Sequence, residues 1–247
     1  NKGGEMNNFG GVLVLSLLPF FQFFQPGNPH QLASIKELED NLPPELLKKD
    51  AAWFEAWKVS GLSNKSIVPY FHQLDFADDG YRRCGDASAA MVAMFYGVVE
   101  DAETYGWLRE SFGDTTYSMA HVKALRSLGL RANFVQNANQ ELLEAEIASG
   151  RPVIVGWLSG GSIEGGRRPR CDKYGCGHFS VIVGYQGQNT NDGYWIMHDP
   201  SGLPNIVDGG HAANRDGDEV KVPRNLFKQR WEVDGDGTGW AILVDNE

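Results

Sequence analysis

A short apolar segment limits most strongly what this chain can fold into. It begins at Cys84, in YRRCGDASAAMVAMFYG, and is predicted to form a helix that runs to Gly97. Apolar side chains occupy nearly every face of this helix, so no face favours water and the helix belongs in a core. The sequence therefore predicts a buried helix with a thiol in its first turn.

The position of Cys84 favours a nucleophile over a packing residue. The free N–H groups and the dipole at a helix start stabilise a thiolate. A buried cysteine considered alone also fits an inert packing role. The catalytic interpretation therefore requires a base elsewhere in the chain.

Composition excludes some classes of protein. The chain has 247 residues, of which 42% are hydrophobic and 22% charged, so it can bury a sizeable core. Its formal net charge of -10 disfavours a nucleic-acid partner, because binding phosphates needs clustered Lys and Arg. Three cysteines are too few for a disulfide scaffold, so burial has to hold the core.

The first part of the chain differs from the rest. Residues 1–62 are predicted to form an extension, with an apolar segment and a helical strut, and residues 63–247 the main domain. A linker at residues 61–66 marks the boundary, and residues 67–71 are predicted to form the short strand that opens the main domain.

The apolar segment of the extension, residues 7–30, contains no Lys, Arg, Asp or Glu. Pro19, Gln22 and Gln25 interrupt it, which disfavours a transmembrane helix, and no cleavage site of a signal peptide follows. We expect the segment to dock on its own domain, a partner subunit or a membrane face. The localisation stays open, with a secreted, surface or virion assembly among the alternatives.

Helices come first and strands later in the main domain. Further helices are predicted over residues 101–112, 118–128 and 139–148. Strand character marks residues 152–157, 179–186, 194–198, 219–222 and 239–244. Short gaps rich in Gly, Asn and Asp favour antiparallel pairing. The expected fold class is α+β, with the buried helix packed against a twisted antiparallel sheet.

A base for Cys84 is expected at His178, which directly precedes a continuously apolar strand in CGHFSVIVGYQ. A rigid, buried strand would fix its ring. Asp199, in YWIMHDPSG, ends the next predicted strand, and antiparallel pairing brings that end beside the start of the first. Asp199 is therefore the expected orienting partner, whereas His198 points to the opposite face of a regular strand.

The remaining requirement is a donor for the oxyanion that forms when a thiolate attacks a carbonyl. Gln73 precedes Cys84 in VPYFHQLDFADDGYRRC, and its side-chain amide could act together with the backbone N–H of Cys84. Each residue alone has a structural explanation, such as a turn for the aspartate before Pro200. The joint pattern favours a catalytic site.

Four motifs in chain order resemble the papain-like (clan CA) cysteine peptidases of the bacteriocin-processing type and their C39-like relatives. The motifs are VPYFHQ, CGDA, GHFSVIVGY and HDP, within residues 68–244. The resemblance implies a papain-like cysteine peptidase fold, a triad of Cys84, His178 and Asp199, and Gln73 in the oxyanion hole. The chain departs from papain in lacking its CGSCW signature and in having Asp as the third member.

The resemblance implies a thiol protease that cleaves a peptide or protein substrate through a thioester, with no cofactor and no metal. Two other functions stay open. One is a catalytically silent scaffold that acts as a structural or interaction module of a larger assembly. The other is an acyl transferase in which an amine replaces water as the acceptor. The natural substrate also stays open.

Two further segments suggest ion sites. Cys171, Cys176 and His178, in CDKYGCGH, could ligate zinc, but a fourth ligand is not apparent. A reversible disulfide between the two cysteines, or two free thiols, is favoured instead. Residues 234–239 loosely imitate a calcium loop and are better explained as a solvated hairpin turn.

Overall fold

The computed structural model describes residues 66–78, 80–170, 176–187 and 193–246. The extension predicted for residues 1–62, with its apolar segment, lies outside these residues. In the described part, no helix has both the length and the apolar character needed to cross a membrane.

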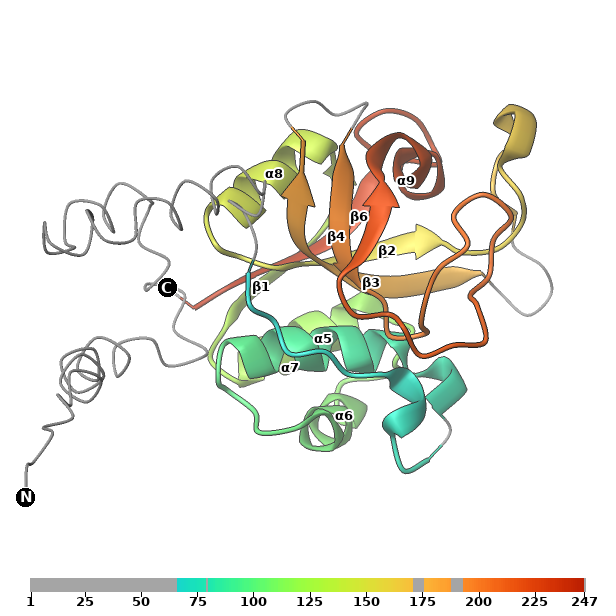
Figure 1. Cartoon of the computed structure of the whole chain (residues 1–247). Coiled ribbons are helices and arrows are strands. Elements are labelled where there is room, and N and C mark those ends of the chain that lie inside the picture. Colours follow the sequence, from blue (N-terminus) through green and yellow to red (C-terminus); the bar gives the residue numbers. More distant parts are fainter. Residues whose placement is uncertain (1–65, 79, 171–175, 188–192, 247) are drawn as a thin grey trace, which may run out of the picture.

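One antiparallel sheet separates two groups of helices (Figure 1). The helices are α5 (Cys84–Phe95), α6 (Ala102–Glu110), α7 (Ser118–Ser127), α8 (Gln140–Ala148) and α9 (Arg224–Trp231). The strands are β1 (Arg131–Ala138), β2 (Val153–Leu158), β3 (Gly177–Gln186), β4 (Tyr194–His198), β5 (Val220–Pro223) and β6 (Gly239–Asp245). Short 3-10 turns are η2 (Gln73–Asp75), η3 (Gly80–Arg82) and η4 (Glu164–Gly166). The strand order is β1-β6-β2-β3-β4-β5, which confirms the predicted α+β class.

The helix that begins at Cys84 is buried, as predicted. Its core positions, such as Ala90 and Met91, are fully inaccessible to solvent. Gly97 closes the helix with a φ of 68°, in the left-handed region that glycine adopts without strain. The N–H of Val98 then donates to the Ala93 carbonyl at 3.1 Å, which satisfies an otherwise free group of the last turn.

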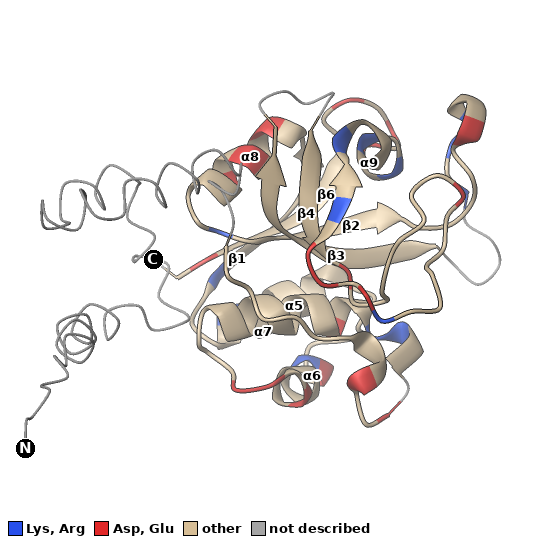
Figure 2. Cartoon of the chain, viewed as in Figure 1, with Lys and Arg blue, Asp and Glu red and all other residues tan. Residues whose placement is uncertain are grey.

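The central strands are largely apolar because both faces of the sheet are covered. Alternate side chains point to opposite faces. Ile154 and Val181 pack in the core that includes α5, whereas Val155 and Ile182 pack in the core that includes α9. Strands β2, β3 and β4 contain no Lys, Arg, Asp or Glu, and charges lie mainly on the helices and loops (Figure 2).

Two sequence predictions about local structure are wrong. Residues 67–71 form no strand, because Pro69 has no N–H to donate to a ladder. The segment is anchored instead by the His198 ring, whose Nε2 donates to the Val68 carbonyl at 2.9 Å. Residues 234–239 are not a hairpin turn but connect α9 to β6, with Lys228 Nζ 3.0 Å from the Asp236 carboxylate.

Candidate active site

The structure places Cys84 as the first residue of α5, where the sequence predicted a helix start. Its side chain is half-buried and its thiol is free. The preceding Arg83 occupies the N-cap position without a side-chain cap. First-turn N–H groups therefore point toward the thiol end of the helix, where they favour negative charge.

His178 and Asp199 meet at neighbouring strand ends. His178 lies near the start of β3, and Asp199 follows the last residue of β4. The antiparallel register pairs Val181 with His198, so the two side chains come together as the sequence predicted. Nε2 of His178 lies 2.8 Å from Oδ1 of Asp199, and both residues are buried.

The Asp199 carboxylate has further partners. Its Oδ1 accepts from the Ser201 backbone N–H at 2.9 Å, and its Oδ2 accepts from the Ser180 hydroxyl at 3.2 Å. The Trp157 indole N–H in turn donates to the Ser180 oxygen at 2.9 Å. These bonds fix the orientation of the carboxylate, and with it the orientation of the imidazole.

Neighbouring charges shift the pKa values of His178 and Asp199 in opposite directions. Burial disfavours a charged imidazole, but the Asp199 carboxylate and the hydrogen-bonded Cys84 side chain outweigh it and raise the pKa of His178 from 6.5 to about 10. Burial also disfavours a charged Asp199, yet the imidazoles of His178 and His211 hold its pKa well below the ordinary value. Since Asp199 occupies Nε2, Nδ1 is the ring nitrogen left for Cys84.

Gln73 lies in η2, and its side chain is buried and hydrogen-bonded at both ends. Oε1 accepts from the Ser201 hydroxyl at 2.8 Å, and Nε2 donates to the Tyr81 carbonyl at 3.3 Å. The Gln73 backbone N–H also donates to the Pro200 carbonyl at 2.8 Å. Pro200 and Ser201, which follow Asp199, therefore position Gln73, the predicted oxyanion donor.

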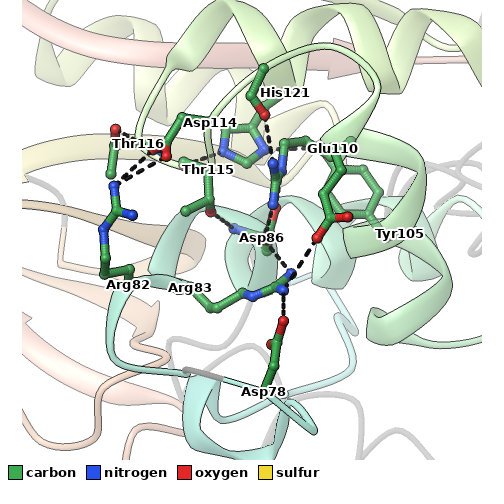
Figure 3. A network of polar contacts seen from close by, with 12 residues as sticks. Asp78, Arg82, Arg83, Asp86, Tyr105, Glu110, Asp114, Thr115, Thr116 and His121 are labelled. Atoms are coloured by element: carbon green, nitrogen blue, oxygen red, sulfur yellow. Dashed lines mark hydrogen bonds and ion pairs between the residues drawn. The ribbon is translucent and has the colours of Figure 1, made fainter.

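A partly buried ionic network lies at the start of α5. Arg83 contacts Asp86 at 3.0 Å and Glu110 at 3.4 Å, and it also pairs with Asp78 (Figure 3). Asp86 is completely buried, and its second guanidinium partner is Arg109. The network ties the first turn of α5 to α6.

Gly85, next to Cys84, is closely surrounded. A Cβ on this residue would lie 2.3 Å from the Thr115 carbonyl oxygen and 2.5 Å from Nε2 of His121. The His121 ring is held there because Nε2 donates to Thr115 at 2.7 Å and Nδ1 accepts from the Tyr105 hydroxyl at 3.1 Å. Burial lowers the pKa of His121, which keeps this ring neutral.

A mostly apolar pocket of about 160 Å³ adjoins the thiol and the imidazole. Its lining includes Cys84, Gly156, Trp157, Phe179, Trp231 and Trp240. Such a concave apolar surface beside polar reactive groups is typical of a substrate site.

His211 is a site residue that the sequence analysis missed. It lies in the loop between β4 and β5, and its Nε2 is 3.3 Å from Oδ2 of Asp199. Its ring contacts the His178 ring edge-on, with centroids 4.6 Å apart. No sequence signal marked it, because it follows two glycines in a segment without periodicity.

The cysteine-based zinc site considered from the sequence is not supported. Cys176 is disulfide-bonded, so its sulfur is not a free thiolate ligand. Cys171, the expected partner, lies outside the described residues.

A family model matches most of this chain. The model of a family described as "Peptidase_C39 like family" matches residues 65–237. No curated protein matches the chain in sequence.

Solved structures are also similar to this chain. A structure described as a C39-like peptidase from Bacillus anthracis has a TM-score of 0.50 and 18% identity, over 73% of this chain and 96% of that chain. A double glycine motif protease from an AMS/PCAT transporter, solved with its leader peptide, has a TM-score of 0.45 and 20% identity, over 73% and 93%. The peptidase domain of Streptococcus ComA has a TM-score of 0.43 and 22% identity, over 72% and 97%.

Proposed function

Because the chain belongs to the Peptidase_C39-like family, we propose that it is a cysteine peptidase with Cys84 as its nucleophile. The observation that carries this proposal is the 2.8 Å contact between Nε2 of His178 and Oδ1 of the buried Asp199, with Cys84 and His178 lining the same pocket. A nucleophile, a base and a third group that orients the base form the arrangement that such chemistry requires.

In the proposed reaction, His178 takes the proton of Cys84 to give a thiolate and an imidazolium. Asp199 stabilises the imidazolium and keeps the ring oriented through Nε2. The thiolate attacks the peptide carbonyl, His178 protonates the leaving amine, and water then hydrolyses the thioester. The raised pKa of His178 supports this assignment, since the charged imidazolium is the form that the site favours.

Gln73 is the proposed side-chain donor to the oxyanion, together with the backbone N–H of Cys84. Support comes from its burial and from the Ser201 hydroxyl, which engages Oε1 and so fixes which end of the amide donates. A preorganised donor stabilises the charge that develops in the transition state without having to reorient.

The proposed substrate is a polypeptide that inserts an apolar side chain near the scissile bond. The pocket lined by Trp157, Trp231 and Trp240 beside the thiol supports this class of substrate. Burial of one large apolar side chain contributes about 1.5–3 kcal/mol, enough to select among peptides.

The test combines labelling with product analysis. Iodoacetamide at neutral pH should alkylate Cys84 in the wild type, and His178→Ala should slow this reaction by lowering the thiolate fraction. A peptide library should be cleaved by the wild type but not by Cys84→Ala. Failure to cleave any peptide, with an unreactive Cys84, would point to a silent scaffold. Transfer of the acyl group to added amines in place of hydrolysis would point to a transferase.

A further inference from the structure

Three side chains with metal-binding atoms gather beside Cys84. They are His178, Asp199 and His211, and one ligand atom of each lies within 4.8 Å of the other two. This is the one such group of three His, Cys, Asp or Glu residues within the described ranges. The Cys84 chemistry proposed above uses the first two for proton transfer and orientation and assigns His211 no proton transfer.

Both imidazoles point the same nitrogen at one carboxylate. Nε2 of His178 lies 2.8 Å from Oδ1 of Asp199, and Nε2 of His211 lies 3.3 Å from Oδ2. Each contact currently needs a proton between two electron-rich atoms. A cation at the centre of the group could replace those protons.

Hydrogen bonds from neighbouring residues hold the proposed ligands in position. Ser180 and Ser201 fix the carboxylate of Asp199, which has no exposed surface. The loop of His211 is fixed by the Gly210 N–H, which donates to the Ser159 carbonyl at 2.7 Å. Metal sites depend on such outer partners to orient their ligands.

The buried Arg230 provides a second anchor for this loop. Its Nε donates to the Ile206 carbonyl at 2.6 Å, and its Nη2 donates to the Val207 carbonyl at 3.2 Å and to the Gly161 carbonyl at 2.6 Å. One guanidinium therefore joins the His211 loop to the segment that follows β2. Arg230 keeps His211 within reach of Asp199.

The donor set identifies the class of ion. Two imidazole nitrogens and one carboxylate oxygen suit zinc and similar divalent transition ions, with water as a fourth ligand. Ligand atoms around a tetrahedral zinc lie about 3.4 Å apart, whereas the atoms of this group lie within 4.8 Å of one another, so the His211 ring has to turn inward slightly. Its ring is 16% exposed and is therefore the member of the group most able to move.

We propose that His178, Asp199 and His211 bind a zinc-like divalent cation, which switches the site off. Two metal–nitrogen bonds and one metal–oxygen bond form. The proton on Nε2 of each imidazole leaves to solvent as the metal binds there, and each ring holds a proton on Nδ1. His178 then carries its only ring proton on Nδ1, so it cannot accept the Cys84 proton, and donating that proton would leave an imidazolate.

Binding can be tested without any peptidase activity. The Cys84→Ala chain, free of purification tags and stripped with a chelator, is titrated with Zn²⁺ by calorimetry and with Co²⁺ by visible absorption. We expect one saturable site and a tetrahedral Co²⁺ spectrum without thiolate ligation. His211→Ala in the same background should weaken binding more than about tenfold, since loss of an outer partner alone costs about 10–100-fold.

His72→Ala is the matched control, since it removes an imidazole that is not a member of the group and whose Nδ1 accepts from the Leu74 N–H at 3.2 Å, and it should leave the affinity unchanged. No saturable binding by Cys84→Ala, or equal affinity after His211→Ala, overturns the proposed metal site.

The inhibitory part rests on the proposed peptidase function and has its own measurement. Zn²⁺ should abolish peptide cleavage by the chain with Cys84 intact, a chelator should restore it, and His211→Ala should raise the inhibitory concentration by the same factor as the dissociation constant. Cleavage that persists at saturating Zn²⁺ overturns the inhibition while the metal site stands. Metal binding without cleavage in metal-free buffer contradicts the peptidase alone.

Discussion

Arg109 donates hydrogen bonds to both carboxylate oxygens of Asp86, in the first turn of the helix that begins at Cys84. Nε lies 2.6 Å from Oδ1 and Nη2 lies 2.7 Å from Oδ2. The aspartate has no exposed surface and the arginine almost none. An acidic group in the first turn also suits the helix dipole, so the pair fixes both the position and the polarity of the helix start.

Arg109→Met should strongly destabilise the fold. It leaves the Asp86 charge buried with a weaker set of partners, and breaking a buried pair in this way costs about 3–5 kcal/mol. The measurement is the free energy of unfolding from urea denaturation. Arg131→Met is the matched control, because its pair with Asp245 is 58% and 31% exposed and should contribute no more than about 1 kcal/mol. Equal losses in the two variants would contradict the anchoring role.

Gly85→Ala should displace the start of α5. The added Cβ falls 2.3 Å from the Thr115 carbonyl and 2.5 Å from the His121 ring, closer than atoms can approach. We expect a loss of about 1–3 kcal/mol in unfolding free energy. Gly177→Ala is the control, because nothing lies within 4 Å of its Cβ position. A stability of Gly85→Ala equal to that of the control would show that the packing at this point is loose.

Much of the candidate site follows from local patterns. The apolar run after Cys84 predicts burial of its helix, because no face of it favours water. The pairing of His178 with Asp199 follows from two adjacent strands, since antiparallel neighbours return the chain to the same edge. Both predictions about position depend on residues close in sequence or on one hairpin. Whether these residues catalyse a reaction stays a proposal.

What the sequence does not reveal depends on distant partners. Strand β1, in RANFVQNA, shows only weak alternation of apolar and polar residues. Its pairing partner, β6, is the last strand in chain order. The sequence of helix α9, RNLFKQRW, is too polar to predict a buried helix. In the structure the buried Arg230 side chain donates to backbone carbonyls of β2 and of the loop between β4 and β5. Tertiary contacts of this kind hold the His211 loop near Asp199, so a pattern along the chain could not predict the position of His211.

Gln73→Ala should lower kcat about 10²–10³-fold with little change in KM, because an oxyanion donor acts mainly in the transition state. The measurement is steady-state cleavage of a peptide that the wild type cuts. Ser201→Ala separates catalysis from packing, since it removes the hydroxyl that donates to Gln73 Oε1 at 2.8 Å and keeps the amide. A kcat loss in Ser201→Ala as large as that in Gln73→Ala would assign Gln73 a structural role.

Asp199→Asn should shift the alkaline limb of the pH profile to lower pH. The pKa of His178 is raised from 6.5 to about 10, so its charged form persists through neutral pH and is lost as the pH rises through about 10. Stability from this ion pair is likewise fully present below 6.5 and lost as the pH rises through the folded-state pKa. Removing the carboxylate charge removes the largest cause that raises the pKa of His178. We also expect kcat to fall by up to about 10⁴-fold, as when an orienting aspartate is lost from a triad.

The measurement is kcat/KM from pH 5 to 11 with a chelator present. Ser180→Ala, which removes a 3.2 Å hydrogen bond to Oδ2 but keeps the charge, should leave the limb nearly in place. An unchanged limb in Asp199→Asn would mean that the Asp199 charge does not stabilise the imidazolium.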